Sequence, residues 1–365
     1  MGAVRRVPDA TVVALDGEPP RRLTASQAAR LAGATGSRRR SGRPAPAPTR
    51  PAATPSGGAA VRPDSADQRS ADVPVPLSAS RAAAEPVAPQ GVRTDLLDFV
   101  RRRLAGDYEV DETGFDAELT DRVLAAPLRP LYRRWFRVDA LGMDHVPDSG
   151  GALVVANHSG TVAVDAVMTQ LALLDHHPAR RNLRMLGADL VFSLPIIGSY
   201  ARKAGHTLAS PADAQRLLGG GELVGVWPEG FKGIGKPFSQ RYRLQRFGRG
   251  GFVAAALRAR VPIIPTAIVG AEEIYPMLGN SPTLARLLGL PYFPLTPTFP
   301  WLGPLGLIPL PSKWFIEFGE PIPTDGYPDG AADDPMLVFN LTDHVRQTIQ
   351  ESIYRLLRRR RTVFG

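Results

Sequence analysis

Residues 153–168 read LVVANHSGTVAVDAVM, and the predicted fold is organised around them. The apolar run Ala152–Ala156 is typical of a buried strand, and it ends two residues before His158. Reactive groups often lie just past strand ends in α/β sheets, and a nearby carboxylate that holds the imidazole tautomer would make His158 a general base. Asp165 is such an acid, seven positions further on. On one continuous helix the two would lie ~10 Å apart along the axis, so contact requires a non-helical chain near Gly160.

Composition and charge exclude several kinds of protein. The 365 residues include no cysteine, which excludes disulfides, thiolate metal sites and cysteine nucleophiles, and the six histidines lack a metal-binding spacing. The net charge is +9, but residues 1–90 carry +6 from 13 arginines and 7 acids, and the Arg358–Arg361 run adds +4. The remainder is close to neutral and has no nucleic-acid-binding signature, so we expect no specific nucleic-acid partner. We also expect no signal peptide, because no apolar core follows the N-terminal arginines.

Four segments are expected along the chain. Residues 1–92 form a tail rich in Ala, Pro and Arg that lacks aromatic residues. It is expected to be disordered, with at most a transient helix over Thr24–Ala32, because it cannot bury enough apolar area to offset the entropy of ordering. Residues 93–145 are expected to form an amphipathic helical segment, 146–330 the core, and 331–365 a C-terminal helix with a basic end.

The stretch 119–138 combines apolar and basic residues. Pro127 and Pro130 are expected to break it into two pieces. Its apolar side includes Trp135 and Phe136, which alternate with arginines. Such a basic helix fits a membrane-surface element, and it fits equally well a helix that packs on its own domain with a solvated basic face.

Strand and helix patterns alternate after residue 150. The expected strands are Ala152–Ala156, Leu183–Leu186, Glu222–Trp227, Pro262–Val269 and Trp314–Phe318. The expected helices are Val162–Leu174, Pro211–Leu218, Gly250–Ala259 and Pro335–Arg358. This alternation predicts an α/β fold in a single domain after the tail, with a sheet covered by helices.

A second cluster of candidate site residues lies in the segment 223–237, which reads LVGVWPEGFKGIGKP. Its glycines and Lys236 are spaced as in a Walker phosphate loop, but Pro237 stands where a hydroxyl would hold magnesium. A P-loop-like nucleotide-binding protein is therefore only a remote alternative. Glu229 and Gly230 directly follow the strand, where a carboxylate and a permissive glycine can meet a ligand at the sheet edge.

Together these segments resemble the lysophospholipid/glycerol-phosphate acyltransferase superfamily. In that family the first block pairs a histidine with an aspartate, and the third block reads Pro-Glu-Gly. Residues 194–218 are similar to the family's second region, and Val261–Thr266 is similar to its fourth block, V-P-I-x-P-x. The resemblance extends over about residues 130–325 and includes four motifs in order. It implies a mixed, mostly parallel twisted sheet flanked by helices.

Three departures from the family's pattern concern the acceptor. The first block is His-x6-Asp, as in a bacterial subgroup, where the family usually has His-x4-Asp. Pro211 follows Gly205–Ser210 where the second block ends in arginine, and Phe231-Lys232 replaces Thr-Arg or Thr-Ser in the third. In the family the missing residues help to hold the acceptor's phosphate. A phosphorylated glycerol acceptor and a neutral glyceride or other lipid alcohol therefore both stay open.

The resemblance implies direct acyl transfer from an acyl thioester to the hydroxyl of a glycerolipid or related lipid alcohol. His158, oriented by Asp165, would be the general base, and no cofactor or metal would be needed besides the acyl-CoA or acyl carrier protein that donates the acyl group. Backbone N–H groups near Gly160 or Gly230 would stabilise the oxyanion. The substrate-binding residues are expected to be Gly160, Glu229, Gly230, Lys232 and Arg243.

The implied partners are an acyl thioester donor, a lipid acceptor and a membrane surface, with the enzyme cytoplasmic and peripheral on the inner face of the cell membrane. A non-catalytic or differently specialised lipid-binding relative of the same fold is the alternative. Residues 287–312 are uncharged and contain seven prolines and three glycines, so they are not expected to span a bilayer. They predict a rigid apolar loop that docks on lipid or roofs an acyl-chain groove, or else a loop that packs into the core.

Overall fold

The computed structural model describes residues 92–364. The chain divides into two compact units, Met1–Pro86 and Val87–Gly365, and the described residues all belong to the second. The predicted disorder of the tail and the transient helix over Thr24–Ala32 lie outside the described residues.

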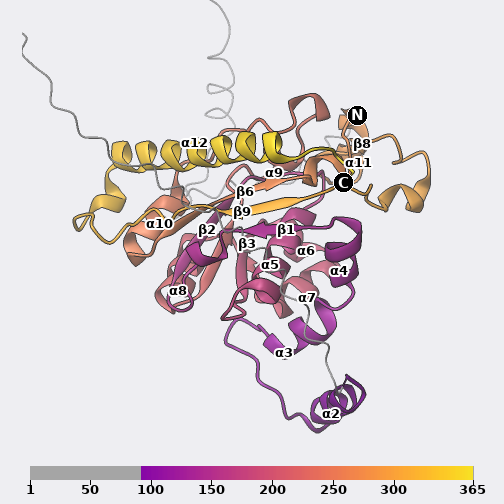
Figure 1. The fold of residues 1–365 in the computed structure, drawn as a ribbon, viewed down its shortest axis with the longest axis horizontal. Helices are drawn as coiled ribbons and strands as arrows, with labels where there is room; N and C mark the ends of the chain where they lie inside the picture. Colours follow the sequence, from indigo (N-terminus) through magenta and orange to yellow (C-terminus); the bar gives the residue numbers. More distant parts are fainter. Residues whose placement is uncertain (1–91, 365) are drawn as a thin grey trace, which may run out of the picture. The chain divides into compact units, whose positions relative to one another are not determined.

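Within residues 92–364, seven strands form one sheet in the order β1-β9-β6-β2-β5-β3-β4 (Figure 1). Their bounds are β1 Asp139–Leu141, β2 Ala152–Ala156, β3 Leu183–Gly187, β4 Thr207–Leu208, β5 Leu223–Val226, β6 Ile263–Val269 and β9 Phe315–Phe318. Strands β6 and β9 run antiparallel, and the other neighbours run parallel. The predicted mixed, mostly parallel sheet is therefore confirmed.

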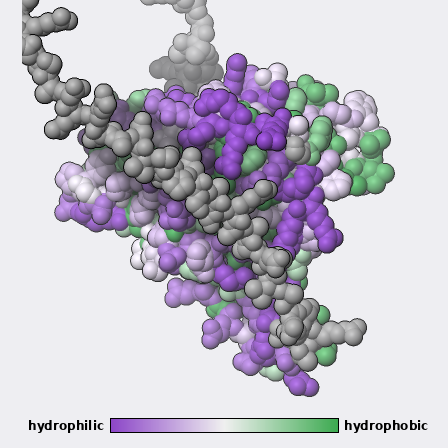
Figure 2. All heavy atoms as spheres, in the orientation of Figure 1, coloured by the Kyte–Doolittle hydropathy of each residue, from purple (hydrophilic) through white to green (hydrophobic). Residues whose placement is uncertain are grey.

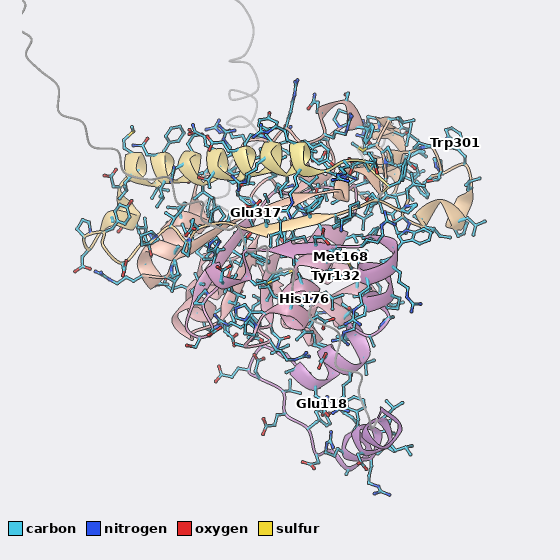
Figure 3. The ribbon with its side chains drawn as sticks, viewed as in Figure 1. Glu118, Tyr132, Met168, His176, Trp301 and Glu317 are labelled. Carbon is cyan, nitrogen blue, oxygen red and sulfur yellow. The ribbon has the colours of Figure 1, made fainter. Side chains whose placement is uncertain are left out.

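The central strands β2, β5 and β6 consist entirely of buried residues, because helices cover both faces of the sheet. The longer helices are α2 Val92–Ala105, α5 Val164–His176, α7 Pro195–Lys203, α8 Pro211–Gly219, α10 Gly251–Ala259 and α12 Pro335–Arg359. On one face α8, α10 and α12 pack against Leu153 and Val155 of β2. On the other, α5 packs against Val154. Tyr132, Met168 and His176 lie on the side of the sheet away from α12 (Figure 3).

The shorter elements occur at turns and at the edges of the sheet. They are α3 Ala117–Leu119, α4 Leu128–Pro130, α6 Asp189–Ser193, α9 Phe231–Ile234, α11 Pro282–Leu287, and the paired strands β7 Gly279–Asn280 and β8 Pro294–Leu295. Short π- or 3-10-helical turns are η1 Thr120–Leu124, η2 Leu131–Trp135, η3 Met143–His145, η4 Phe238–Gln240, η5 Ala271–Glu273, η6 Gly303–Leu307 and η7 Ala331–Asp333. Among residues 92–364, no helix combines the length and the apolar character that crossing a bilayer requires.

The N-terminal helical segment differs from its prediction in two respects. It also supplies a strand, since β1 pairs with β9. The interpretation of Phe136 as a membrane-facing residue is wrong: its side chain is fully buried, and its ring stacks on Trp314 with a centroid distance of 4.6 Å. Trp135 is half-exposed, and its Nε1 donates to the carbonyl of Pro309 at 2.9 Å. The predicted break occurs at Pro127, while Pro130 lies within the second piece.

Candidate active site

The site is built where β2 ends. His158 Nδ1 lies 2.8 Å from Asp165 Oδ2, so the predicted hydrogen bond between these side chains is present. Asp165 is fully buried, and its Oδ2 also accepts from the backbone N–H of Ser159 at 2.8 Å. Because a carboxylate accepts from Nδ1–H, it selects the tautomer whose Nε2 can take a proton. Nε2 makes no hydrogen bond to the described part of the chain.

The two side chains meet because the chain between them is not helical. Gly160 and Thr161 have φ angles of 94° and 63°, and helix α5 begins only at Val164. A left-handed conformation is readily adopted by glycine but is uncommon for threonine. A Cβ on Gly160 would lie 2.6 Å from the Ala271 carbonyl oxygen, so the close approach of these two loops requires glycine. The predicted non-helical chain near Gly160 is confirmed.

Glu229 joins the end of β5 to the histidine loop. Its Oε1 accepts from the backbone N–H of His158 at 2.9 Å, and its Oε2 accepts from the N–H of Gln245 at 2.6 Å. The side chain is fully buried, and burial raises the pKa of Glu229 above its usual value. Glu229 thus lies beside His158 as expected, but its carboxylate is occupied by backbone donors instead of facing an acceptor.

Lys236 is part of a buried charge network behind this loop. Its Nζ lies 3.0 Å from Glu272 Oε1 and 3.8 Å from Glu229 Oε2, and it donates to the carbonyl of Arg243 at 3.3 Å. A Walker lysine must reach out to phosphates, whereas this one is held by acids inside the protein. The P-loop-like alternative therefore has no support from the geometry.

The other predicted substrate-binding residues lie at exposed positions. Lys232 and Arg243 are exposed, and in the described chain neither side chain has a hydrogen-bond or ion-pair partner. Gly230 is exposed with a φ of 54°, and its N–H donates to the Trp227 carbonyl at 3.0 Å. The structure therefore brings His158, Asp165, Gly160 and Glu229 together, and leaves the two cations on the surface.

Sequence reasoning missed several neighbours of the histidine. The Trp227 ring centroid lies 6.0 Å from that of His158, and Trp227 could have been noticed because it precedes Pro-Glu-Gly. The hydroxyl of Tyr292 donates to the carbonyl of Thr161 from a distant segment, with no local signal in the sequence. Among residues 92–364, no cluster of three or more His, Cys, Asp or Glu residues could hold a metal ion.

One family model and several known proteins are similar to this chain. A family model described as Acyltransferase matches residues 137–269. An uncharacterized protein of Mycobacterium tuberculosis (strain ATCC 25618 / H37Rv) is 59% identical over 266 residues, which is 73% of this chain and 74% of that protein. The human "DGAT1/2-independent enzyme synthesizing storage lipids" is 25% identical over 192 residues, or 52% of this chain and 55% of that enzyme. The crystal structure of the 1-acyl-sn-glycerophosphate acyltransferase PlsC from Thermotoga maritima matches with a TM-score of 0.44 and 17% identity, over 72% of this chain and 88% of that one.

The histidine–aspartate pair lies at the end of a central strand, within the residues that the Acyltransferase family model matches. The chain belongs to the acyltransferase family, and it is an enzyme of that class.

The buried acid Glu272 leads to a prediction about pH. Burial raises the pKa of Glu272 from 4.5 to about 7, and Lys236 only partly opposes this. Because the folded state then binds a proton that the unfolded state has released, the free energy of unfolding should fall by about 3 kcal/mol as pH rises from 4.5 to above 7. Urea titrations should show a smaller loss in Glu272→Gln than in the parent, with the remainder expected from Glu229, whose pKa burial also raises. Glu351→Gln, at an exposed position of α12, is the matched control. Parallel stability profiles for the parent and Glu272→Gln would rule out Glu272 as the cause.

Proposed function

We propose that the enzyme transfers a fatty acyl group from an acyl thioester to the hydroxyl of a glycerolipid or related lipid alcohol. The observation that supports this most is the His158–Asp165 hydrogen bond at the carboxyl end of β2 in a chain of the acyltransferase family. The similarity to the human "DGAT1/2-independent enzyme synthesizing storage lipids" favours a lipid acceptor.

In the proposed reaction His158 Nε2 takes the proton of the acceptor hydroxyl. The oxygen attacks the thioester carbonyl, the C–O bond forms, and the C–S bond breaks as the tetrahedral intermediate collapses. The thiolate of coenzyme A or of acyl carrier protein leaves and receives the proton held by the imidazolium. Atoms and charges balance without a covalent enzyme intermediate.

Asp165 would serve the proton transfer in two ways. It holds the imidazole in the tautomer that presents a basic Nε2, and its negative charge stabilises the imidazolium that forms. Its carboxylate is kept in place because Oδ1 accepts from the N–H of Ala166 and Oδ2 from that of Ser159, each at 2.8 Å.

The oxyanion of the intermediate would be stabilised by a backbone donor near Gly160. Of the two glycines considered from the sequence, Gly230 already donates its N–H to Trp227, whereas the N–H of Gly160 has no acceptor within residues 92–364. A free donor next to the general base is suited to a charge that develops only during the reaction.

Both substrates in this proposal carry acyl chains, so we place the enzyme on the cytoplasmic side, peripheral on the inner face of the cell membrane. The donor would be acyl-CoA or acyl carrier protein. For the acceptor, the exposed cations Lys232 and Arg243 could bind a phosphate, but no buried arginine in the described chain lies at the histidine site to do so.

A panel of acceptors tests this proposal. Purified enzyme is incubated with radiolabelled acyl-CoA, or in a parallel series with radiolabelled acyl carrier protein thioester. Each donor is combined separately with lysophosphatidate, lysophosphatidylcholine, monoacylglycerol and diacylglycerol, and labelled products are separated by chromatography. We expect a labelled ester with at least one acceptor. If lysophosphatidate is the acceptor, Lys232→Gln with Arg243→Gln should raise its KM and leave that of diacylglycerol unchanged. Absence of an ester with every acceptor, and with both donors, would contradict the proposal.

A further inference from the structure

The segment between η5 and β9 is an almost uncharged excursion from the sheet. This excursion, residues 274–312, contains a single charged residue, Arg286, and no acid. It includes α11, the β7–β8 pair and η6. An excursion of this length would normally need charged or polar residues to stay in water.

The apolar side chains of the excursion face outward. Within this fully described segment, ten large apolar residues are exposed. The most exposed are Leu287 at 78%, Trp301 at 72%, Leu278 at 67% and Leu305 at 66%. Trp301 lies at the outer edge of the molecule (Figure 3), and apolar side chains gather at the end where Figure 1 places α11 and β8 (Figure 2). Clusters of this kind mark interaction surfaces.

The same excursion is tied to the catalytic loop. Thr161 Oγ1 donates to the carbonyl of Tyr275 at 2.9 Å, and the hydroxyl of Tyr292 donates to the carbonyl of Thr161. The apolar surface and the left-handed turn after His158 are therefore held together by hydrogen bonds. The segment that carries the apolar surface is thus anchored at Tyr275 and Tyr292 to the turn that follows His158.

A basic, acid-free segment flanks the excursion. Residues 231–250 contain six cations and no acid. The N–H of Phe238 donates to the Met277 carbonyl at 2.8 Å, and Arg241 lies over the Phe238 ring at 4.4 Å. Five of the six cations are exposed, the exception being Lys236. These charges complement anionic lipid headgroups, whereas a second copy of the chain would bring like charges together.

We infer that the excursion docks on the surface of a membrane that contains anionic lipid, with Leu287, Trp301 and Leu305 inserted among the acyl chains and the cations of residues 231–250 at the headgroups. This inference rests on the proposed function, because a lipid acceptor in the bilayer would then enter beside the catalytic loop. The inferred membrane surface is not the basic stretch 119–138 considered from the sequence, because Phe136 of that stretch is buried.

The test measures binding of the full chain to vesicles of phosphatidylcholine with and without phosphatidylglycerol. The test variant is Leu287→Ser with Trp301→Ser and Leu305→Ser; the matched control is Met336→Ser with Phe339→Ser and Tyr354→Ser, three exposed residues of α12. We expect the test variant to bind vesicles at least about tenfold more weakly than the parent, and the control variant to bind like the parent. Phosphatidylglycerol should strengthen parental binding, and salt should weaken it in part. Equal binding by parent and test variant, or loss of binding in the control instead, would overturn the inference.

Two further measurements separate this inference from the proposed function. With a short-chain thioester and a short-chain acceptor that are dissolved singly, the test variant should transfer acyl groups at the parental rate. Parental vesicle binding in the test variant, together with active transfer, would reject the docking surface alone. If vesicle binding depends on these residues but the enzyme transfers no acyl group, only the proposed function would be rejected. The surface would belong to a second copy of the chain if the parent sediments as a dimer, the test variant sediments as a monomer, and vesicle binding is unchanged. That result would overturn the inference.

Discussion

His158→Ala is expected to lower kcat for acyl transfer by about 10³-fold, because the variant has no base to remove the acceptor proton. The imidazole lies at the edge of the site, with 12% of its side chain exposed, so the variant should remain folded. Steady-state rates with the best acceptor of the panel, together with a thermal unfolding curve, check both expectations. His344→Ala, at an exposed position of α12, is the control and should keep parental kcat.

Asp165→Asn extends this prediction to the partner of the histidine. Asparagine keeps the shape of the side chain but can stabilise the wrong tautomer and cannot stabilise the imidazolium, so kcat should fall by about 10²- to 10⁴-fold. Parental kcat in either His158→Ala or Asp165→Asn would exclude the pair as the acid–base device.

Glu229→Ala is expected to lower the free energy of unfolding by about 3–5 kcal/mol. The substitution removes the acceptor of two backbone N–H groups, those of His158 and Gln245, and one of the two acids near buried Lys236. Chemical denaturation measures the loss. Glu229→Gln, which keeps one acceptor oxygen, should lose less.

The kinetics of Glu229→Gln distinguish a positioning role from contact with the acceptor. If the carboxylate only holds the backbone of His158, kcat should fall while KM for the acceptor stays near the parental value. A raised acceptor KM with parental kcat would instead show that Glu229 binds the acceptor. Parental stability of Glu229→Ala would contradict the structural role of its two hydrogen bonds.

The sequence predicts the long elements because their burial leaves a regular pattern. Ala152–Ala156 is found as predicted, since a parallel strand covered on both faces is apolar throughout. The helix after it begins at Val164 instead of Val162, because the left-handed turn at Gly160 and Thr161 delays it. Strand β1 has three residues and pairs with β9 more than 170 positions away, so no local pattern reveals it.

The site is predictable to the extent that it is local in sequence. His158, Asp165 and Gly160 lie in one short segment, and their contact follows from the need for a non-helical turn. The location of Glu229 follows from its strand end, but the direction of its carboxylate depends on Gln245 and His158, which come from other loops. The Phe136 side chain shows the same limit, because an amphipathic pattern does not tell whether its apolar side meets lipid or, as here, Trp314.

The most direct measurement compares the thiol released with the ester formed in a single reaction of acyl-CoA and lipid acceptor. Thiol is followed with a chromogenic disulfide and ester by mass spectrometry, for the parent and for His158→Ala at equal protein concentration. We predict one ester per thiol in the parent, no thiol release above background when the acceptor is omitted, and loss of both products in the variant. Thiol release without ester, or ester formation at the parental rate by His158→Ala, would contradict direct acyl transfer with His158 as the base.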